Sequence, residues 1–319
     1  MTTYRNSLPQ LQGDFYLTDG GIETTLIFLE GLELPDFAAF TLLKAKDGRA
    51  ALREYFRTYA GLAQRFGTGL VLESATWRAS ADWGVKLGYS AQEVRDANRQ
   101  AVALLEEVRS ESGTAPGKTV ISGCVGPRGD GYNPNRTMSA EEAEEYHGDQ
   151  INVFEDTAAD MVTAITMNYV EEALGITRAA RRAGMPVAIS FTVETDGRLP
   201  TGQELRSAVE QVDAETSSYP SYYMINCAHP THFEDVLAAD QPWSQRIRGL
   251  RSNASRKSHA ELNESVDLDI GDPSELGRQH AQLKRRHPQL NVMGGCCGTD
   301  HRHIEQIAMA CSPLFRGWA

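Results

Sequence analysis

The residues with the clearest chemical potential form a short turn near the C-terminal end, Gly-Gly-Cys-Cys-Gly-Thr at 294–299. The neighbouring Cys296 and Cys297 are poorly placed to bridge each other, because disulfide geometry does not suit adjacent Cα atoms. Two thiolates on one tight turn can instead bind a single soft metal ion. The turn therefore predicts a metal site, against the alternative that both cysteines are small buried hydrophobes.

Cys227 is the candidate for a third sulfur ligand. Three sulfur ligands without a fourth are typical of a catalytic zinc site that keeps one position open. A thiol that binds in the open position is deprotonated by the metal, and the thiolate is the nucleophilic form. Zinc that activates water or a carbonyl more often has His or carboxylate ligands. The sulfur-rich set therefore favours alkyl transfer to sulfur over hydrolysis.

The remaining cysteines and the nearby histidines are weaker candidates. Cys124 and Cys311 lack a glycine-rich context, so we expect them to pack in the core. His229 follows Cys227 by two residues, and His301 and His303 follow the 294–299 turn. We expect these three histidines to be solvated or to face the substrate, without binding the metal.

Eight short apolar runs recur along the chain, each followed by a polar or glycine-containing segment. They span residues 15–18, 70–72, 119–122, 161–165, 187–191, 222–225, 247–250 and 290–293. Runs this short suit strands better than core helices. Amphipathic stretches lie between them, at 53–66, 91–108, 140–156, 170–182, 204–212 and 273–287. Alternating strands and helices predict parallel pairing, and eight strands predict a single-domain (β/α)8 barrel over residues 1–319, with its core at about 14–311.

The barrel places the three cysteines together. Active sites of such barrels lie at the C-terminal ends of the strands. Cys227 follows the sixth run, and the cysteine pair follows the eighth. These strand ends are separated by roughly 10 Å, or two inter-strand spacings. Side chains that point inward can therefore meet at one ion. The long polar segment 251–272 is expected to cover the mouth or to mediate contacts in a homo-oligomer.

One alternative fold and several exclusions bear on this prediction. A doubly wound open sheet is disfavoured, because no Gly-x-Gly-x-x-Gly follows the first run. The net charge of -12 argues against nucleic-acid binding. The sequence contains no run of 18 apolar residues, so no membrane span is expected. No secretory signal is visible. Five cysteines, an odd number, fit a reducing cytoplasm.

Several motifs together resemble the homocysteine S-methyltransferase family. They are Asp19-Gly20-Gly21, Thr76 with Ala79-Ser80, and the segments 123–127, 189–193, 225–227 and 294–299. The family includes betaine–homocysteine methyltransferase, S-methylmethionine-dependent enzymes and the homocysteine domain of methionine synthase. The resemblance runs from about residue 14 to 307. It implies methyl transfer to a thiol such as homocysteine, with Zn²⁺ held by Cys227, Cys296 and Cys297.

The resemblance also implies a substrate pocket. The turn Asp19-Gly20 is expected to contact the amino-acid end of the acceptor. Ser74 and Thr76 are expected to line the same pocket. Asn226, beside the third ligand, is assigned to substrate binding as well.

One position departs from the family pattern. Family members that act on homocysteine carry a Glu at the end of strand four, which pairs with the substrate ammonium. This chain has Ile165 there. An apolar side chain cannot balance a desolvated ammonium. Either another carboxylate takes over, with Glu23, Glu73 and Glu194 as candidates, or the acceptor is a different thiol. We include Glu194 among the expected substrate-binding residues.

The methyl donor is expected to be a small, already activated molecule. The chain carries no additional module for folate or corrinoid, so a sulfonium such as S-methylmethionine, or a betaine, is favoured. Such a cation suits an aromatic wall, for which Trp77, Trp83, Tyr132 and Tyr169 are candidates. Two other functions stay open. One is different alkyl-transfer chemistry on a thiol other than homocysteine; the other is non-catalytic zinc or redox sensing.

Overall fold

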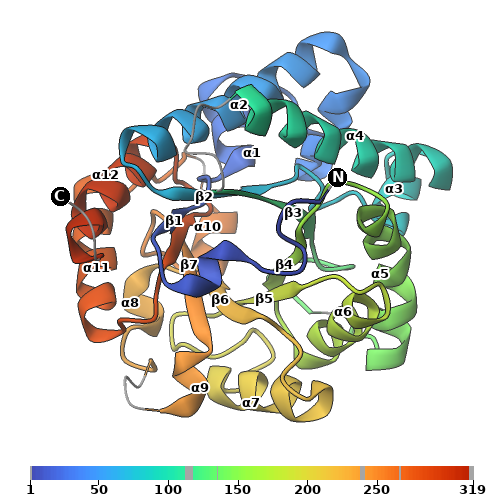
Figure 1. The fold of residues 1–319 in the computed structure, drawn as a ribbon. Helices are drawn as coiled ribbons and strands as arrows, with labels where there is room; N and C mark the ends of the chain where they lie inside the picture. The colour runs from blue at the N-terminus through green and yellow to red at the C-terminus, as the bar shows by residue number, and fades with distance from the viewer. Residues whose placement is uncertain (1, 112–117, 135, 238–240, 266, 316–319) are drawn as a thin grey trace.

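The computed structural model describes residues 2–111, 118–134, 136–237, 241–265 and 267–315. Eight parallel strands close into a barrel in sequence order, β1 to β8, and helices surround it (Figure 1). The strands are β1 (Tyr16–Leu17), β2 (Gly69–Glu73), β3 (Thr119–Val125), β4 (Met161–Met167), β5 (Val187–Thr192), β6 (Tyr222–Asn226), β7 (Ile247–Ser252) and β8 (Val292–Gly295). Each contains or overlaps one of the eight apolar runs. The expected (β/α)8 barrel is therefore confirmed.

Long helices follow most strands and form the outer layer. They are α2 (Lys46–Arg65), α4 (Ala91–Glu111), α5 (Ala140–Glu155), α6 (Val170–Arg182), α7 (Leu205–Thr216), α11 (Pro273–Arg286) and α12 (His301–Cys311). Helix α5 begins with the Ser139–Glu142 capping box. This pairing satisfies backbone N–H groups that the first turn leaves free.

Helix α2 begins seven residues before the expected start at Arg53. Its first turn contains Gly48, a residue that disfavours helix in isolation. A Cβ at Gly48 would lie only 2.4 Å from the carbonyl oxygen of Leu42. The close packing of the preceding segment therefore requires glycine at a position where local propensity argues against a helix.

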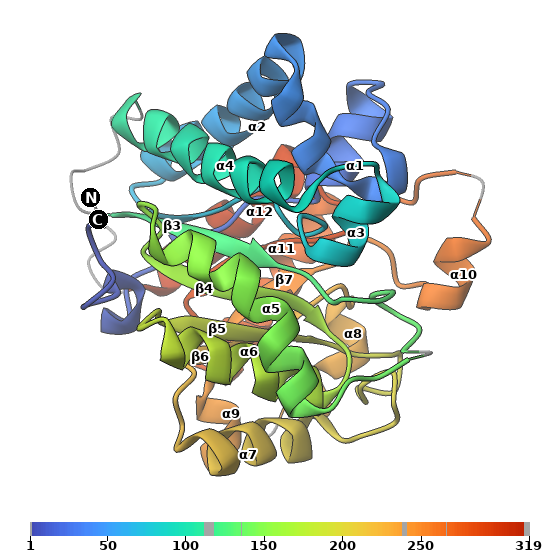
Figure 2. The same cartoon turned by 90° about the vertical axis from the view of Figure 1, so that its right-hand side faces the viewer.

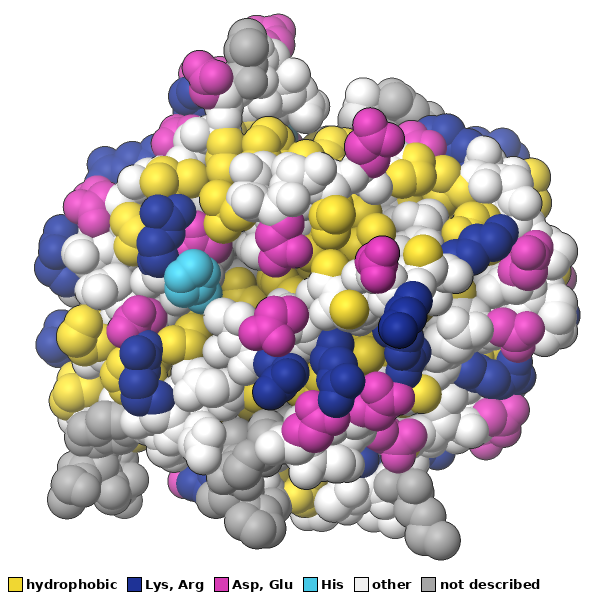
Figure 3. All heavy atoms as spheres, turned by 90° about the horizontal axis from the view of Figure 1, so that it is seen from above, with side chains coloured by type: hydrophobic (Ala, Val, Ile, Leu, Met, Phe, Trp, Pro, Cys, Tyr) yellow, Lys and Arg dark blue, Asp and Glu magenta, His cyan; other side chains and the backbone are white. Residues whose placement is uncertain are grey.

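The outer face over α2 and α4 carries charges of both signs among hydrophobic side chains (Figure 3). Several of these charges pair between helices, as Arg49 of α2 does with Glu107 of α4 at 2.6 Å. Exposed pairs of this kind contribute little stability, about 0–1 kcal/mol each. The stability of the layer therefore depends on its apolar inner face, where residues such as Leu52, Phe56 and Leu105 are buried.

The N-terminal end of the barrel is filled by the chain before β1. Leu8 is buried, and Tyr4 and Leu11 pack against the same cluster of barrel residues, which includes Tyr16 and Tyr222. This packing closes the end opposite to the cysteines. The barrel is thereby left with its cavity at the C-terminal end.

The C-terminal end of the barrel is flanked by short helices. Helices α1 (Ile22–Thr24), α3 (Ala81–Lys86) and α10 (His259–Asn263) lie at this end (Figure 2). The strand β7 continues to Ser252, so the polar segment after it is shorter than expected. Residues of the segment with α10 line the cavity at the mouth. Among the described residues, no helix has both the length and the apolar character needed to cross a membrane.

Candidate metal centre and substrate cavity

The structure brings the three expected cysteines together at the C-terminal mouth. Cys227 directly follows β6, and Cys296 and Cys297 directly follow β8. Their Sγ atoms all lie within 4.8 Å of one another, and Cys227 Sγ is 3.9 Å from Cys297 Sγ. Three Zn–S bonds of about 2.3 Å at tetrahedral angles would separate the sulfurs by about 3.8 Å. The cluster therefore has the dimensions of a thiolate metal site.

The glycines of the turn are required by close packing. A Cβ at Gly294 would lie 1.9 Å from Thr18 Oγ1, and one at Gly295 would lie 2.1 Å from Thr299 Oγ1. Gly298 has a φ of +79°, which favours glycine. Flanking glycines thus let the end of β8 approach β1 and direct both cysteines toward the centre of the mouth.

Cys227 has an unusual backbone conformation, with a φ of +54°. Its carbonyl oxygen accepts hydrogen bonds from Asn253 Nδ2 (3.0 Å) and from His259 Nε2 (2.7 Å). Both partners belong to the polar segment after β7. A strained conformation at a ligand position persists only when surrounding contacts enforce it. The segment that lines the mouth therefore also orients a candidate metal ligand.

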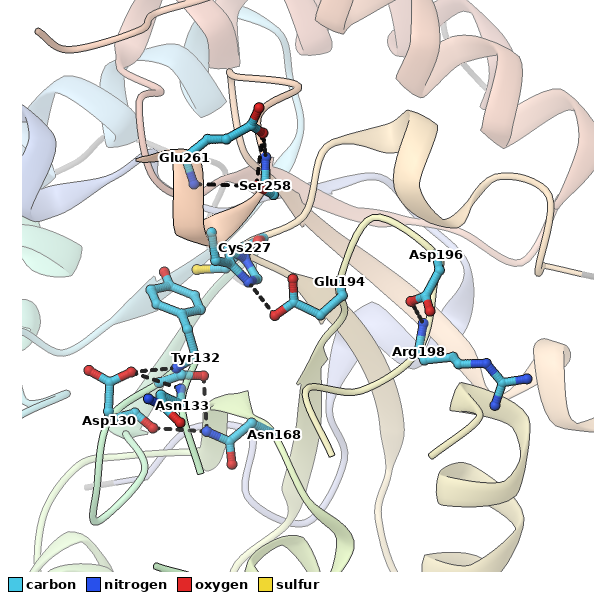
Figure 4. Close-up of polar contacts among 12 residues, drawn as sticks. Asp130, Tyr132, Asn133, Asn168, Glu194, Asp196, Arg198, Cys227, Ser258 and Glu261 are labelled. Carbon is cyan, nitrogen blue, oxygen red and sulfur yellow. Dashed lines mark hydrogen bonds and ion pairs between the residues drawn. The ribbon is translucent and has the colours of Figure 1, made fainter. Parts of the chain in front are cut away.

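His259 links this segment to Glu194. Its Nδ1 lies 3.0 Å from Glu194 Oε1, and its ring stacks on Tyr132 with centroids 4.1 Å apart. Figure 4 shows Tyr132, Glu194 and Cys227 gathered around this point. Burial opposes the charged imidazolium, but the hydrogen bonds to Glu194 and to the Cys227 carbonyl outweigh it and raise the pKa of His259. His259 therefore acts as a double donor between two acceptors.

The three thiols influence one another strongly. Thiol hydrogen bonds from Cys296 and Cys297 to the Cys227 sulfur lower the pKa of Cys227 well below its usual value. The same contacts raise the pKa of Cys297. Tyr132 Oη lies 3.4 Å from Cys297 Sγ, on the side of the cluster that faces the cavity. Among the three cysteines, Cys227 is therefore the one whose thiolate form these contacts favour.

The histidines near the cysteines have structural roles. His229 is buried and caps the short helix α8 (Pro230–Phe233) by accepting from Thr231 N. His303 is buried too, bonding to Asp300 in a capping box. The expectation that these two are solvated or face the substrate is wrong, because helix ends bury them; His301 is exposed. Within the described chain, the cysteines form the one cluster of three or more potential ligands.

A cavity of about 370 Å³ opens beside the cysteine cluster. Of the expected substrate-binding residues, Asp19, Gly20 and Ser74 line it. Thr76, Glu194 and Asn226 do not. Thr76 Oγ1 donates to the Cys124 carbonyl (2.7 Å), and Glu194 is held by His259. Cys124 is buried and also lines the cavity, whereas Cys311 is buried in α12.

Asn226 connects the ends of three neighbouring strands. Its Oδ1 accepts from Thr166 N (3.0 Å) on β4 and from Ser190 Oγ (2.6 Å) on β5. Its Nδ2 donates to Thr166 Oγ1 (2.9 Å) and lies 3.9 Å from Cys296 Sγ. Thr166 has a φ of +68°, which is rare for a β-branched residue. Asn226 therefore stabilises a strained strand end directly beside the sulfurs.

Arg251 is a site residue that sequence reasoning missed, because it was assigned to the polar segment after β7. Its Nη2 lies 2.6 Å from Asp19 Oδ1 in a buried ion pair, and Tyr55 Oη donates to Asp19 Oδ2 (2.8 Å). Arg251 also donates to the carbonyls of Gly20 and Gly295. One guanidinium thus joins the ends of β1, β7 and β8. Extending the seventh predicted strand to residue 252 would have placed Arg251 at a strand end, where site residues of the barrel lie.

Ile165 lines the cavity together with several carboxylates besides Asp19, namely Glu23, Glu73, Asp130, Asp267 and Asp269. Burial raises the pKa of Glu73 to about 7 and that of Glu23 to about 7. Glu73 Oε2 is buried without a hydrogen-bond partner among the described residues. Ile165 lies on the wall, as its place at the end of β4 requires. The cavity therefore holds acidic groups, but none at the position of Ile165.

The expected aromatic wall is only partly present. Trp77 and Tyr132 line the cavity, whereas Trp83 and Tyr169 do not. Tyr169 Oη accepts from the Met138 backbone N–H (3.1 Å) and is buried. The two tryptophan rings are already occupied by a cation of the protein, because the Arg78 guanidinium stacks on both. A donor cation would therefore compete with Arg78 for contact with these rings.

Fold and site together define a class: a closed (β/α)8 barrel with a three-thiol cluster at its C-terminal mouth, beside an acidic cavity. The family model for homocysteine S-methyltransferase matches residues 16–311. The chain therefore belongs to the homocysteine S-methyltransferase family, as its motifs indicated.

Curated relatives are longer than this chain. It is 26% identical over 245 residues to methionine synthase of Mycobacterium tuberculosis, a match that covers 71% of this chain and 19% of that protein. Methionine synthase of Mycobacterium leprae is 25% identical over 239 residues, with 69% and 18% covered. The chain thus spans about a fifth of the length of these relatives.

Solved structures with the same fold include the homocysteine methyltransferase MmuM from Escherichia coli. Its metallated form superposes with a TM-score of 0.74 at 18% identity, covering 96% of this chain and 98% of that one. Its oxidised form gives a TM-score of 0.75 at 19% identity, with 95% and 97% covered. At this identity the likeness supports the fold alone.

Proposed function

We propose that this protein transfers a methyl group from a small activated donor to a thiol acceptor, homocysteine or a related thiol. The observation that carries the proposal is the convergence of three sulfurs on the wall of a cavity of small-molecule size. Membership of the homocysteine S-methyltransferase family supports it. The shared barrel of MmuM, which is a homocysteine methyltransferase solved in a metallated form, also supports the proposal.

Zinc is the metal that we propose for the cluster. Thiolate ligands select soft ions, and a three-sulfur set with an open fourth position suits catalytic zinc. Cys227, Cys296 and Cys297 would hold it. When bound there, zinc lowers the pKa of a thiol acceptor and keeps its sulfur nucleophilic at neutral pH.

The other residues bind and orient the reactants. The Asp19-Gly20 turn is held rigid by Arg251 and Tyr55, and it faces the cavity where the amino-acid end of the acceptor would lie. Glu23 and Glu73 line the cavity, and an adjacent cation favours their ionised forms, which can balance an ammonium or an onium group. The segment with α10 covers the mouth and limits the access of water, which would otherwise compete for the methyl group.

The test compares metal content and thiol methylation in the parent protein and in Cys297→Ser. We expect about one zinc per parent chain, and a loss of both zinc and activity in the variant. Cys311→Ala removes a buried cysteine far from the cluster and should keep both properties. Full-rate thiol methylation by the zinc-free parent would overturn the proposal. Zinc release by mild oxidant, without turnover by any donor and thiol pair, would favour a redox sensor instead.

A further inference from the structure

Arg78 is a buried cation in the wall of the cavity. Its guanidinium lies over two indole rings, with its carbon 3.9 Å from the Trp77 centroid and 3.8 Å from the Trp83 centroid. The residue is 6% exposed. Contacts with two rings restrict the guanidinium, and so restrict the directions in which its N–H groups can donate.

The hydrogen-bonding capacity of Arg78 is largely unused. Nη1 donates to the Gly129 carbonyl at 2.9 Å. Nε is buried and has no partner among the described residues. In that part of the chain no carboxylate lies within ion-pair distance of Arg78, and the Asp130 Oδ1 atom instead accepts from the backbone N–H groups of Tyr132 and Asn133. A buried cation without an anionic partner is costly.

The other arginine of the cavity is satisfied. Arg251 pairs with Asp19 at 2.6 Å and bonds two carbonyl oxygens. The imidazole of His259 is held between Glu194 and a carbonyl. Arg78 is therefore the cavity-lining cation that, in the described structure, makes no direct ion pair, and the charges of Asp130 and Glu23 act on it only from a longer distance. Burial lowers the pKa of Arg78 to about 10, so the group stays charged at neutral pH.

We propose that Arg78 binds a carboxylate of the small molecule that occupies this cavity, and so determines its specificity. This inference rests on the proposed function in that it assigns the carboxylate to one of the two reactants, acceptor or donor. The planar fork of Arg matches a carboxylate, which can accept two parallel hydrogen bonds. A phosphate dianion is disfavoured relative to a carboxylate monoanion, because the aspartates that line the same cavity, Asp130, Asp267 and Asp269, repel the larger charge more strongly.

The first experiment measures anion binding without metal or turnover. Zinc-free protein is titrated calorimetrically with butyrate, and with butyramide as a neutral molecule of the same shape. We expect butyrate to bind more tightly than butyramide and to lose at least about tenfold in affinity in Arg78→Gln. Butyramide binding should not change. Because no methyl group is transferred, this result is independent of the proposed activity.

The second experiment assigns the carboxylate to one reactant. KM is measured for 4-mercaptobutyrate and 4-mercaptobutyramide at saturating donor, and for a carboxylated sulfonium donor and its amide at saturating thiol. Arg78→Gln should raise KM for the carboxylate, with its amide unaffected, in only one of the two series. That series identifies the reactant that Arg78 holds.

Controls separate recognition from folding. Arg128→Gln removes another arginine that stacks on an aromatic ring, Tyr146, but does not line the cavity, and it should bind butyrate as the parent does. Arg78→Lys keeps a cation without the planar fork and should bind with intermediate affinity. If Arg78→Gln does not fold, the Nε–H resonance of Arg78 in the parent should still shift on butyrate titration.

The outcomes are distinct. Equal butyrate affinity in a folded Arg78→Gln, an unshifted Arg78 resonance, or tighter binding of inorganic phosphate than of butyrate would overturn the inference. Loss of butyrate binding in Arg78→Gln, combined with no methyl transfer by the parent, would leave the inference standing and remove the proposed function.

Discussion

Burial changes the pKa of single residues at the mouth from the value they have in water. Glu73 is 5% exposed, and one of its oxygens lacks a partner in the described structure. Burial disfavours its charged form, and the attraction of Arg251 offsets this only in part, so the pKa of Glu73 rises from 4.5 to about 7. A raised carboxyl pKa means that the folded protein retains a proton that the unfolded chain releases.

This retained proton makes stability depend on pH. Between pH 4.5 and about 7 the unfolded chain has lost the Glu73 proton and the folded protein has kept it. Stability from this group is therefore complete below pH 4.5 and falls as pH rises toward 7, by about 3 kcal/mol in total. Glu73→Gln should remove this part of the decline in urea-unfolding free energy. The pKa of Glu23 is raised in the same way, so Glu23 should still cause part of the fall in unfolding free energy in the Glu73→Gln variant.

A control for this measurement is Glu54→Gln on the exposed face of α2, which should reproduce the parent profile. A Glu73→Gln profile that is parallel to that of the parent over this pH window would contradict the prediction.

At the scale of the elements, strand ends must be held in register for the sulfurs to meet. Asn226 at the end of β6 bonds to Thr166 on β4 and to Ser190 on β5. Arg251 on β7 contacts the ends of β1 and β8. These two side chains join strands on both sides of the cysteines. Their role is to position ligands, which explains why Asn226 does not itself line the cavity.

Asn226→Ala should therefore weaken both the fold and the metal site. The change leaves the Thr166 N–H and the Ser190 hydroxyl without their partner, which we expect to cost about 3 kcal/mol of unfolding free energy. It also releases the strained backbone at Thr166 beside Cys227. Zinc affinity, measured by competition with a chromophoric chelator, should fall at least about tenfold.

Asn291→Ala is a matched control for this change. Asn291 is equally buried and donates two hydrogen bonds of 2.7 Å to carbonyl oxygens, but it lies before β8 at the opposite end of the barrel. It should lose stability with unchanged zinc affinity. An equal effect of both variants on zinc binding would show that Asn226 has no positioning role.

The whole molecule is a barrel closed at one end and covered at the other. Residues 4–11 fill the N-terminal end, and the segment with α10 lines the mouth. The ends of β6 and β8, which carry the cysteines, are not adjacent in the sheet, because β7 lies between them. A metal ion on the three sulfurs would thus cross-link strands that no backbone hydrogen bond joins.

Metal removal should consequently lower thermal stability. A ligand that binds only the folded state stabilises it by about 4 kcal/mol at a free concentration of about 1,000 times Kd. For a chain of this size that corresponds to roughly 6 °C in Tm. Calorimetry of zinc-loaded and chelator-treated protein should show this difference, and Cys297→Ser should show almost none. An unchanged Tm in the parent after verified zinc loss would contradict the cross-linking role.

Much of the fold was predictable from local patterns. The eight apolar runs and the number of strands in the barrel depend on neighbouring residues, and the structure agrees with them. The start of α2 was not predictable, because Gly48 is selected by its contact with Leu42 and not by helix propensity. Local physics specifies elements well where no tertiary contact opposes it.

For the site, the sequence by itself determined the kind of chemistry. Two cysteines among glycines, and a third after an earlier strand, indicated a thiolate metal centre, and the motifs indicated the family. Tertiary structure decided which polar residues face the cavity. It placed Thr76, Glu194 and Asn226 in supporting contacts, and paired Arg251 with Asp19, 232 residues away. Residue type carries intrinsic reactivity, whereas burial and partners, which depend on contacts distant in sequence, decide how each group is used.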